Sequence, residues 1–201
     1  ISHGIKHISI GQFVEGNAPV VWRGPMLHRA LQQFLADVFW GDLDVLLLDL
    51  PPGTGDVALS VAQLIPNAEL LIVTTPQAAA AEVAERAGSI SQQTRQRVAG
   101  VIENMGAMVM PDGSTMDIFG EGGGKVVAER LSVLLGHEVP LMATIPLDPS
   151  LRAAGDEGTP IVIKAPESPA TQAINSVAES IAVRSDSLVG KKLGLGVTRK
   201  G

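Results

Sequence analysis

The sequence predicts an α/β fold in which a mostly parallel sheet is flanked by helices. Short, almost entirely apolar runs, which are typical of strands buried on both faces, alternate with longer segments whose apolar residues recur at helical spacing. Hydrophobic residues make up 45% of the 201 residues and charged residues 18%, which is enough apolar material for a buried core. Repeated strand–helix units of this kind favour strands that lie parallel in one sheet.

The predicted elements follow one another in chain order. Residues 5–13 predict a strand, and residues 25–38 predict a helix because Pro25 suits a first helical turn and one apolar face follows it. Four nearly all-apolar runs predict the strands 45–50, 70–75, 98–103 and 141–145. The segments between and after these runs predict the helices 56–64, 78–97, 125–135 and 169–184.

The polar residues that interest us follow the predicted strands. Ligands of parallel α/β sheets bind at the carboxyl ends of the strands. Four polar segments of this chain begin at such ends: Asp49 to Asp56, Thr74 to Gln77, Asn104, and Pro146 to Asp148. We therefore expect a functional site along this edge of the sheet.

Residues 49–56, which read Asp-Leu-Pro-Pro-Gly-Thr-Gly-Asp, form the strongest motif. A carboxylate at a strand end, here Asp49, can hold Mg²⁺ through water beside nucleotide phosphates. Pro51 and Pro52 end the strand, whereas Gly53 and Gly55, on either side of Thr54, allow a backbone close to a phosphate. Asp56 can cap the following helix. The pattern predicts nucleotide chemistry, and the simpler alternative is a strand–helix turn with a buried or capping Asp49.

A dinucleotide site is a second interpretation of the same glycines. Residues 53–58 match the pattern G-x-G-x-x-A between a strand and a helix. The acid expected at the end of the next strand is replaced by Thr74 and Thr75, and Asp56 puts a negative charge where a pyrophosphate should lie. An NAD(P)-binding oxidoreductase is therefore the weaker alternative.

Three further segments are open to more than one interpretation. The amide of Asn104 can pair with the edge of a base, or it can belong to a turn. Pro146 and Asp148 follow the next strand and can pack against that base. Residues 119–124, Phe-Gly-Glu-Gly-Gly-Gly, predict either a phosphate or partner loop or simply a glycine-rich entry into a helix.

Composition excludes several classes of function. The chain has no cysteine, which rules out disulfides, a thiol nucleophile and a Cys-ligated iron–sulfur cluster within it. The pair His3 and His7 lacks the intervening Glu of a zinc-protease helix, so no metal is expected there. A net charge of −6 and 3% aromatic residues argue against nucleic-acid binding. Without an apolar run of about 18 residues or a signal peptide, we expect a cytoplasmic protein without a membrane anchor.

These motifs together resemble the Mrp family of iron–sulfur cluster carrier ATPases, which belong to the MinD/ParA-like P-loop proteins with a deviant Walker A loop. The resemblance runs from about residue 5 to residue 183. The matching stretches are Trp22-Arg-Gly-Pro-Met26, Asp49-Leu-Pro-Pro-Gly-Thr-Gly-Asp56, Val73-Thr-Thr-Pro-Gln77, Glu103-Asn-Met105, Phe119-Gly-Glu-Gly-Gly-Gly124 and residues 145–162.

The resemblance implies ATP binding, ATP hydrolysis and homodimerisation. It also implies delivery of iron–sulfur clusters to apoproteins, with apoproteins or assembly factors as partners. It assigns Asp49 to magnesium binding and water positioning, and the loop 51–56, with Gly53 and Asp56, to sensing of the γ-phosphate. It assigns Asn104 and the region from Pro146 to Asp148 to the adenine.

The chain departs from the family pattern in two places. It has no G-K-G-G-V-G-K-[ST] loop, and losing about four hydrogen bonds to charged phosphates removes at least about 6 kcal/mol of binding. We therefore expect this chain, which begins at Ile1, to be the C-terminal part of a longer ATPase, with an incomplete sheet and little activity alone.

The second departure concerns the cluster. Where many family members carry Cys-x-x-Cys, residues 108–113 read Met-Val-Met-Pro-Asp-Gly. Thioethers are weak ligands, so Met108 and Met110 are expected to pack at an interface or in the core. An ATP-controlled dimerisation switch that carries no cluster is the alternative function. Residues 1–184 are expected to form the ATPase-type domain and residues 185–201 a flexible basic tail.

Overall fold

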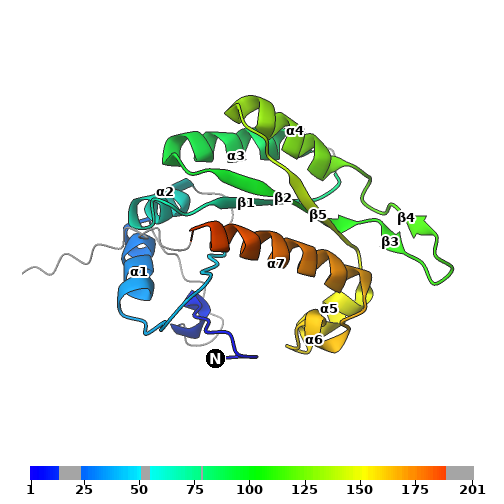
Figure 1. Cartoon of the computed structure of the whole chain (residues 1–201), viewed down its shortest axis with the longest axis horizontal. Helices are drawn as coiled ribbons and strands as arrows, with labels where there is room; N and C mark the ends of the chain where they lie inside the picture. Colours follow the sequence, from blue (N-terminus) through cyan, green and yellow to red (C-terminus); the bar gives the residue numbers. More distant parts are fainter. Residues whose placement is uncertain (14–23, 51–54, 78, 189–201) are drawn as a thin grey trace, which may run out of the picture.

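Three parallel strands form the central sheet in the part of the chain that the structure describes. The computed structural model describes residues 1–13, 24–50, 55–77 and 79–188. The strands β1 (Leu70–Thr74), β2 (Val98–Gly106) and β5 (Leu141–Pro146) lie in the order β1-β2-β5. The helices α3 (Ala80–Thr94) and α4 (Gly123–Leu135) cover one face of this sheet, and α7 (Pro169–Leu188) covers the other (Figure 1).

Other elements flank these three layers. A 3-10 helix (Ile10–Phe13), α1 (Gly24–Ala36) and α2 (Gly55–Leu64) precede β1. Between β2 and α4 the chain forms an antiparallel hairpin of β3 (Met108–Val109) and β4 (Thr115–Met116), which projects from the sheet in Figure 1. The short helices α5 (Pro149–Asp156) and α6 (Ile161–Lys164) connect β5 to α7. None of the helices in the described ranges is long and apolar enough to cross a membrane.

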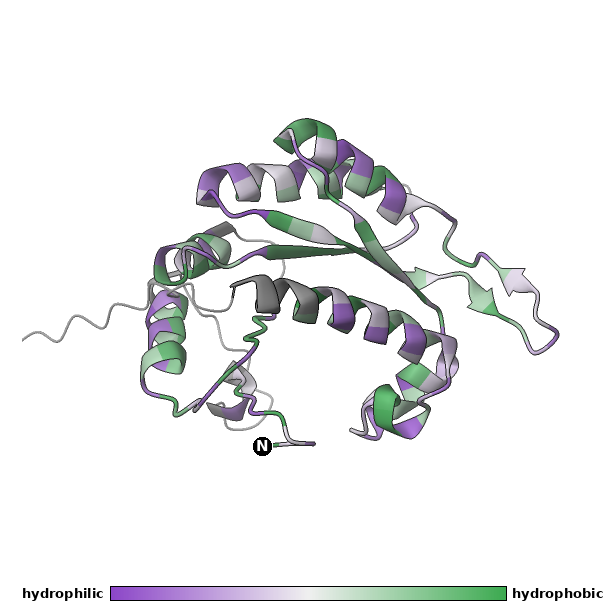
Figure 2. Cartoon of the chain, viewed as in Figure 1, coloured by the Kyte–Doolittle hydropathy of each residue, from purple (hydrophilic) through white to green (hydrophobic). Residues whose placement is uncertain are grey.

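The main core lies between the sheet and the helices α3 and α4. Val98, Val101, Val127 and Leu131 are fully buried there, and β2, which has a strand on each side, is buried along its first six residues. Figure 2 shows hydrophobic residues concentrated in the strands and alternating with hydrophilic ones along the helices. This distribution is what a sheet covered on both faces requires.

Most predicted elements are confirmed. The runs 70–75, 98–103 and 141–145 form β1, β2 and β5, and all their pairings are parallel. The segments predicted as helices form α1, α2, α3, α4 and α7. Because α7 continues to Leu188 and residues 189–201 lie outside the described ranges, the predicted boundary at residue 184 and the basic tail stay predictions.

Two predicted strands are wrong. Residues 5–13 form a 3-10 helix at their end, preceded by an isolated bridge between Ser2 and Ile5. Residues 45–50 have no strand partner among the described residues, and Leu47 is 70% exposed. An apolar run indicates that a segment favours burial, but a strand also needs a neighbouring strand for its backbone hydrogen bonds. In the described part of the sheet β1 has β2 on one side only, and the run 45–50 does not pair with its other edge.

Candidate functional site

The carboxyl ends of the three strands meet at one edge of the sheet, as the sequence predicts. The last common rung consists of Thr74 in β1, Glu103 in β2 and Thr144 in β5. The start of α4 lies against the chain that leaves β1, because a Cβ atom on Gly123 would lie 2.5 Å from the carbonyl oxygen of Thr75. Residues from β1, β2, β5 and α4 therefore converge here.

A β-bulge interrupts β2 directly after this rung. Glu103 pairs with Thr144 and Gly106 pairs with Pro146, so β2 has one residue more than β5 between the two rungs. Met105 absorbs the irregularity with a φ of +59°, a left-handed conformation that costs a residue with a side chain about 1–3 kcal/mol. Its backbone N–H donates a 2.9 Å hydrogen bond to Oδ1 of Asn104. Bulges are frequent beside functional sites, where they redirect side chains.

Gly106 closes the bulge on the side of β5. Its carbonyl oxygen accepts a 2.9 Å hydrogen bond from the backbone N–H of Leu147. A Cβ atom at this position would lie 2.4 Å from Cγ2 of Thr144, a distance that real contacts do not reach. Glycine therefore permits this close approach of β2 and β5 with Thr144 in its present position.

The buried carboxylate of Glu103 joins three elements at the other end of the bulge. The residue is 4% exposed. Its Oε2 atom accepts a 2.6 Å hydrogen bond from the backbone N–H of Gly124 in α4, and its Oε1 atom accepts one of 3.2 Å from Oγ1 of Thr144 in β5. A carboxylate at the first turn of a helix satisfies a free backbone donor and interacts favourably with the helix dipole.

The glycine-rich segment 119–124 is an entry into a helix. Gly122 is the N-cap of α4 with a φ of +75°, and α4 begins at Gly123. Glu103 already occupies the N–H of Gly124, one of the donors that a phosphate would otherwise use. Of the two interpretations open from the sequence, the structure supports the helix entry.

The structure brings together the residues expected to contact a base. Asn104 lies in the bulge and is half-buried, and Pro146 is paired with Gly106 beside it. Asp148 is the N-cap of α5: its Oδ1 accepts hydrogen bonds from the backbone N–H of Ser150, at 2.8 Å, and from the Ser150 hydroxyl, at 2.5 Å. The carboxylate of Asp148 therefore fixes the turn that follows Pro146.

The residues expected near the phosphates are not assembled in the same way. Asp49 is exposed and lies in the unpaired segment 45–50, so its expected position at the end of a strand is wrong. Asp56 is exposed in the first turn of α2, which begins at Gly55. Pro51, Pro52, Gly53 and Thr54 lie outside the described residues. Within the described ranges no three His, Cys, Asp or Glu residues cluster to hold a metal ion.

Residues 108–113 form part of the β3–β4 hairpin. Met108 and Met110 are half-buried, and Val109 is 48% exposed. The side chain of Asp112 closes the turn, because its Oδ1 accepts hydrogen bonds from the hydroxyl of Ser114, at 2.6 Å, and from its backbone N–H, at 2.9 Å. These two bonds lower the pKa of Asp112, the hydroxyl contributing more.

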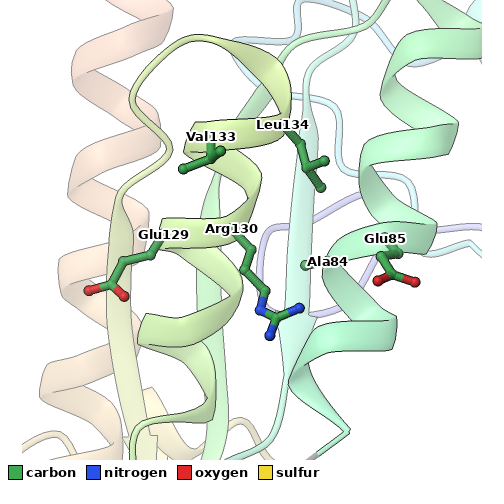
Figure 3. A pocket seen from close by; sticks show the side chains of 6 residues that line it. All are labelled: Ala84, Glu85, Glu129, Arg130, Val133 and Leu134. Atoms are coloured by element: carbon green, nitrogen blue, oxygen red, sulfur yellow. The ribbon is translucent and has the colours of Figure 1, made fainter.

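A shallow pocket of about 320 Å³ lies between α3 and α4, away from the predicted site residues. Figure 3 shows its lining: Ala84 and Glu85 from α3, and Glu129, Arg130, Val133 and Leu134 from α4. Arg130 extends toward α3 from the opposite helix. No residue expected in the functional site contributes to this pocket.

Comparison with known proteins identifies related sequences along nearly the whole chain. The model of the ParA family, described as NUBPL iron-transfer P-loop NTPase, matches residues 1–182. The iron-sulfur cluster carrier protein of Mycobacterium tuberculosis is 67% identical over 200 residues, which are 100% of this chain and 52% of the relative. That of Deinococcus radiodurans is 46% identical over 182 residues, 90% of this chain and 50% of the relative. The chain thus spans about half the length of these curated relatives.

Solved structures agree with the fold. A nucleotide-binding protein from Archaeoglobus fulgidus in complex with ADP is 37% identical, with a TM-score of 0.55 over 66% of this chain and 53% of that one. The cell division ATPase MinD of Pyrococcus furiosus is 23% identical, with a TM-score of 0.56 over 81% of this chain and 59% of that one. At this lower identity the likeness concerns the fold alone, and it confirms the predicted MinD-like α/β architecture.

Proposed function

Because the chain belongs to the ParA family of NUBPL iron-transfer P-loop NTPases, we propose that it works as part of an ATP-dependent carrier that transfers iron–sulfur clusters to apoproteins. The match to the family over residues 1–182 is the observation that carries this proposal. It favours the carrier over the NAD(P)-dependent oxidoreductase, which rested on the glycines of residues 53–58 alone.

The bulge of β2 supports an adenine site. The side-chain amide of Asn104 has its Oδ1 bonded to the N–H of Met105, and Nδ2 has no hydrogen-bond acceptor among the residues that the structure describes. A free amide group beside the half-buried Pro146 suits a purine, whose edge offers both donors and acceptors. Asn104 and Pro146 would contact the base, and Asp148 would hold the turn that carries Pro146.

The phosphates need more than the described residues supply. The sequence contains no lysine-bearing glycine loop of the kind that binds phosphates in these proteins. Asp49 is suited to Mg²⁺, because this ion is usually held by one or two carboxylates together with phosphate oxygens and water. We assign Asp49 to the metal and to water positioning, and the loop 51–56, with Gly53 and Asp56, to the γ-phosphate. Bound Mg²⁺ would supply charge neutralisation for phosphoryl transfer.

The cluster is the cargo of this proposal, and the chain itself does not offer the usual ligands for it. None of the 201 residues is a cysteine, and thiolates are the ligands that hold such clusters. This absence favours a second candidate function, an ATP-controlled dimerisation or partner-binding switch that carries no cluster. In both cases the partners are a second copy of the protein and iron–sulfur apoproteins or assembly factors, in the cytoplasm.

Magnesium-dependent ATP turnover by the full-length natural protein tests the assignment of Asp49. We expect the substitution Asp49→Asn to lower turnover about 100-fold or more, because electrostatic groups of this kind contribute that much to catalysis. Asp44→Asn is the matched control, because Asp44 is also exposed and its substitution removes the same charge five residues earlier in the chain. Equal turnover in the two variants would show that Asp49 does not hold the metal.

Anaerobic reconstitution of the full-length protein with iron and sulfide separates the two functions. A carrier is expected to acquire a stable visible chromophore and to pass it on to an apoprotein. A protein that hydrolyses ATP and dimerises but acquires no chromophore is the switch.

A further inference from the structure

We propose that Glu103 is a positioning residue: its buried carboxylate holds the β2 bulge so that the amide of Asn104 faces the purine base in the orientation that selects adenine. The inference rests on the proposed nucleotide site. The mechanism suggested by the family resemblance gives Glu103 no role.

The first step of the argument is the place of Glu103 in the sheet. It is the last residue of β2 that pairs regularly with both neighbours, with Thr74 on β1 and Thr144 on β5. The irregular residues Asn104 and Met105 follow at once, and regular pairing resumes only at Gly106. Whatever fixes Glu103 therefore fixes one end of the bulge.

The second step is that this end is fixed by side-chain contacts from two other elements. Oε2 of Glu103 accepts the N–H of Gly124 at 2.6 Å, and Oε1 accepts the hydroxyl of Thr144 at 3.2 Å. Glu103 is 4% exposed, so water does not replace these partners readily. Glycine at position 124 is required for this approach, because a Cβ atom there would lie 2.7 Å from Cβ of Glu103.

The third step is that the bulge needs such support. Met105 has a φ of +59° although it carries a side chain and is 41% exposed. Conformations of this kind persist only where the surroundings enforce them. Within the bulge the N–H of Met105 donates to Oδ1 of Asn104.

The fourth step links this geometry to the base. With the N–H of Met105 on Oδ1, the orientation of the Asn104 amide is set, and Oδ1 retains one lone pair beside the two donors of Nδ2. Such a group matches the N7 edge of adenine, which presents the N6 donor and the N7 acceptor, better than the N7 edge of guanine, which presents the two acceptors O6 and N7. Relaxing the bulge would let the amide turn over and lose this distinction.

The test compares the affinities of the full-length natural protein for fluorescent ATP and GTP analogues in four forms. Glu103→Met removes both acceptors at similar volume. Glu103→Gln keeps both hydrogen bonds, because its amide oxygen can accept from the N–H of Gly124 while its NH₂ group donates to the hydroxyl of Thr144. Val177→Ala removes two methyl groups from a buried position on α7 and serves as the control for lost stability. Amide hydrogen exchange at Met105 is followed in all four.

We expect the wild type to prefer ATP and Glu103→Met to lose about tenfold of that preference, as befits one bidentate base contact. Exchange at Met105 should accelerate in the same variant. Glu103→Gln and Val177→Ala should keep the preference. If Glu103→Met does not fold, Thr144→Val, which removes one of the two contacts, should show the same changes to a smaller degree.

Several results would overturn the proposal. An unchanged ATP to GTP ratio in Glu103→Met, or an equal loss in Val177→Ala, would reduce Glu103 to a structural residue. Unchanged exchange at Met105 would show that Glu103 does not hold the bulge, whether or not nucleotide binds. A wild type that binds both nucleotides equally would contradict this inference and leave the nucleotide site standing, whereas a wild type that binds neither would contradict the proposed function.

Discussion

The backbone N–H of Gly124 donates a 2.6 Å hydrogen bond to the carboxylate of Glu103, 21 positions earlier in the chain. The contact ties the first turn of α4 to the carboxyl end of the central strand. It satisfies an N–H group that has no intrahelical partner at the start of a helix. It also gives the buried carboxylate a hydrogen-bond donor, which offsets the cost of its burial. The edge of the sheet is therefore organised by a polar contact as well as by apolar packing.

Gly124→Ala is expected to destabilise the protein by about 2 kcal/mol, because the new Cβ overpacks a filled site. The added atom would lie 2.7 Å from Cβ of Glu103 and 3.0 Å from Cδ1 of Leu141. Urea unfolding measures the change. Gly155→Ala in α5 is the control: no atom lies within 4 Å of its added Cβ, so helix propensity should stabilise that variant by about 0.5–1 kcal/mol. Equal effects would refute the packing argument.

Gly106→Ala is expected to lower the free energy of unfolding by about 1–3 kcal/mol, because its Cβ would overlap Cγ2 of Thr144 at 2.4 Å. The double variant with Thr144→Ser should recover most of this loss, because serine lacks that methyl group and keeps the hydroxyl that bonds to Glu103. A double-mutant cycle by chemical denaturation measures the coupling. Additive effects of the two substitutions would mean that the strands do not approach as closely as described.

Gln96→Met is expected to stabilise the protein by about 1 kcal/mol. Gln96 is 3% exposed, and both polar atoms of its side chain are buried without a hydrogen-bond partner in the described structure. A buried amide without partners carries an uncompensated desolvation cost, which an apolar side chain of similar length removes. Equilibrium unfolding is the measurement, and Gln92→Met on the exposed face of α3 should change stability by less than about 0.5 kcal/mol. A destabilised Gln96→Met would reveal a bound partner.

The hairpin turn at Asp112 is expected to respond to acid. Hydrogen bonds from Ser114 lower the pKa of Asp112 in the folded protein. Because the pKa is lowered in the folded protein, the ionised carboxylate stabilises the turn fully at a pH above the ordinary pKa of an aspartate. This stabilisation is lost as the pH falls through the lowered, folded-state pKa. Ser114→Ala should raise the pKa of Asp112 toward the ordinary value in an NMR titration of the carboxyl carbon, whereas Ser114→Thr should not. An unshifted pKa in Ser114→Ala would contradict the contact.

The sequence predicts those parts of the fold in which local pattern and tertiary context agree. The strands β1, β2 and β5 are apolar runs that also find neighbours, whereas residues 45–50 have the same pattern and find none among the described residues. The helix α5 was missed although Asp148-Pro149 is a recognisable start, with a capping side chain followed by proline at the first position. Its eight residues are too few for a clear helical period.

The candidate site is less predictable than the fold. Asn104 and Pro146 follow from their positions after apolar runs, and the structure pairs Pro146 with Gly106, two residues after Asn104. Glu103 had a signal, an acid at the end of a buried strand, but its partner Gly124 is distant in sequence and only the tertiary structure identifies it. The left-handed conformation of Met105 cannot be predicted from the sequence, because such positions are usually occupied by glycine and a methionine does not indicate one.

The extra residue in β2 has a consequence for how such a site is gained or lost. Deletion of one codon, that for Met105, would leave one residue on each strand between the rungs of Glu103 and Gly106, and the hydrogen-bond ladder could run on without interruption. The sheet would keep its order while Asn104 lost the backbone donor that orients it. The insertion or deletion of a single residue in β2 can therefore create or remove base recognition at this edge without altering any residue of the core.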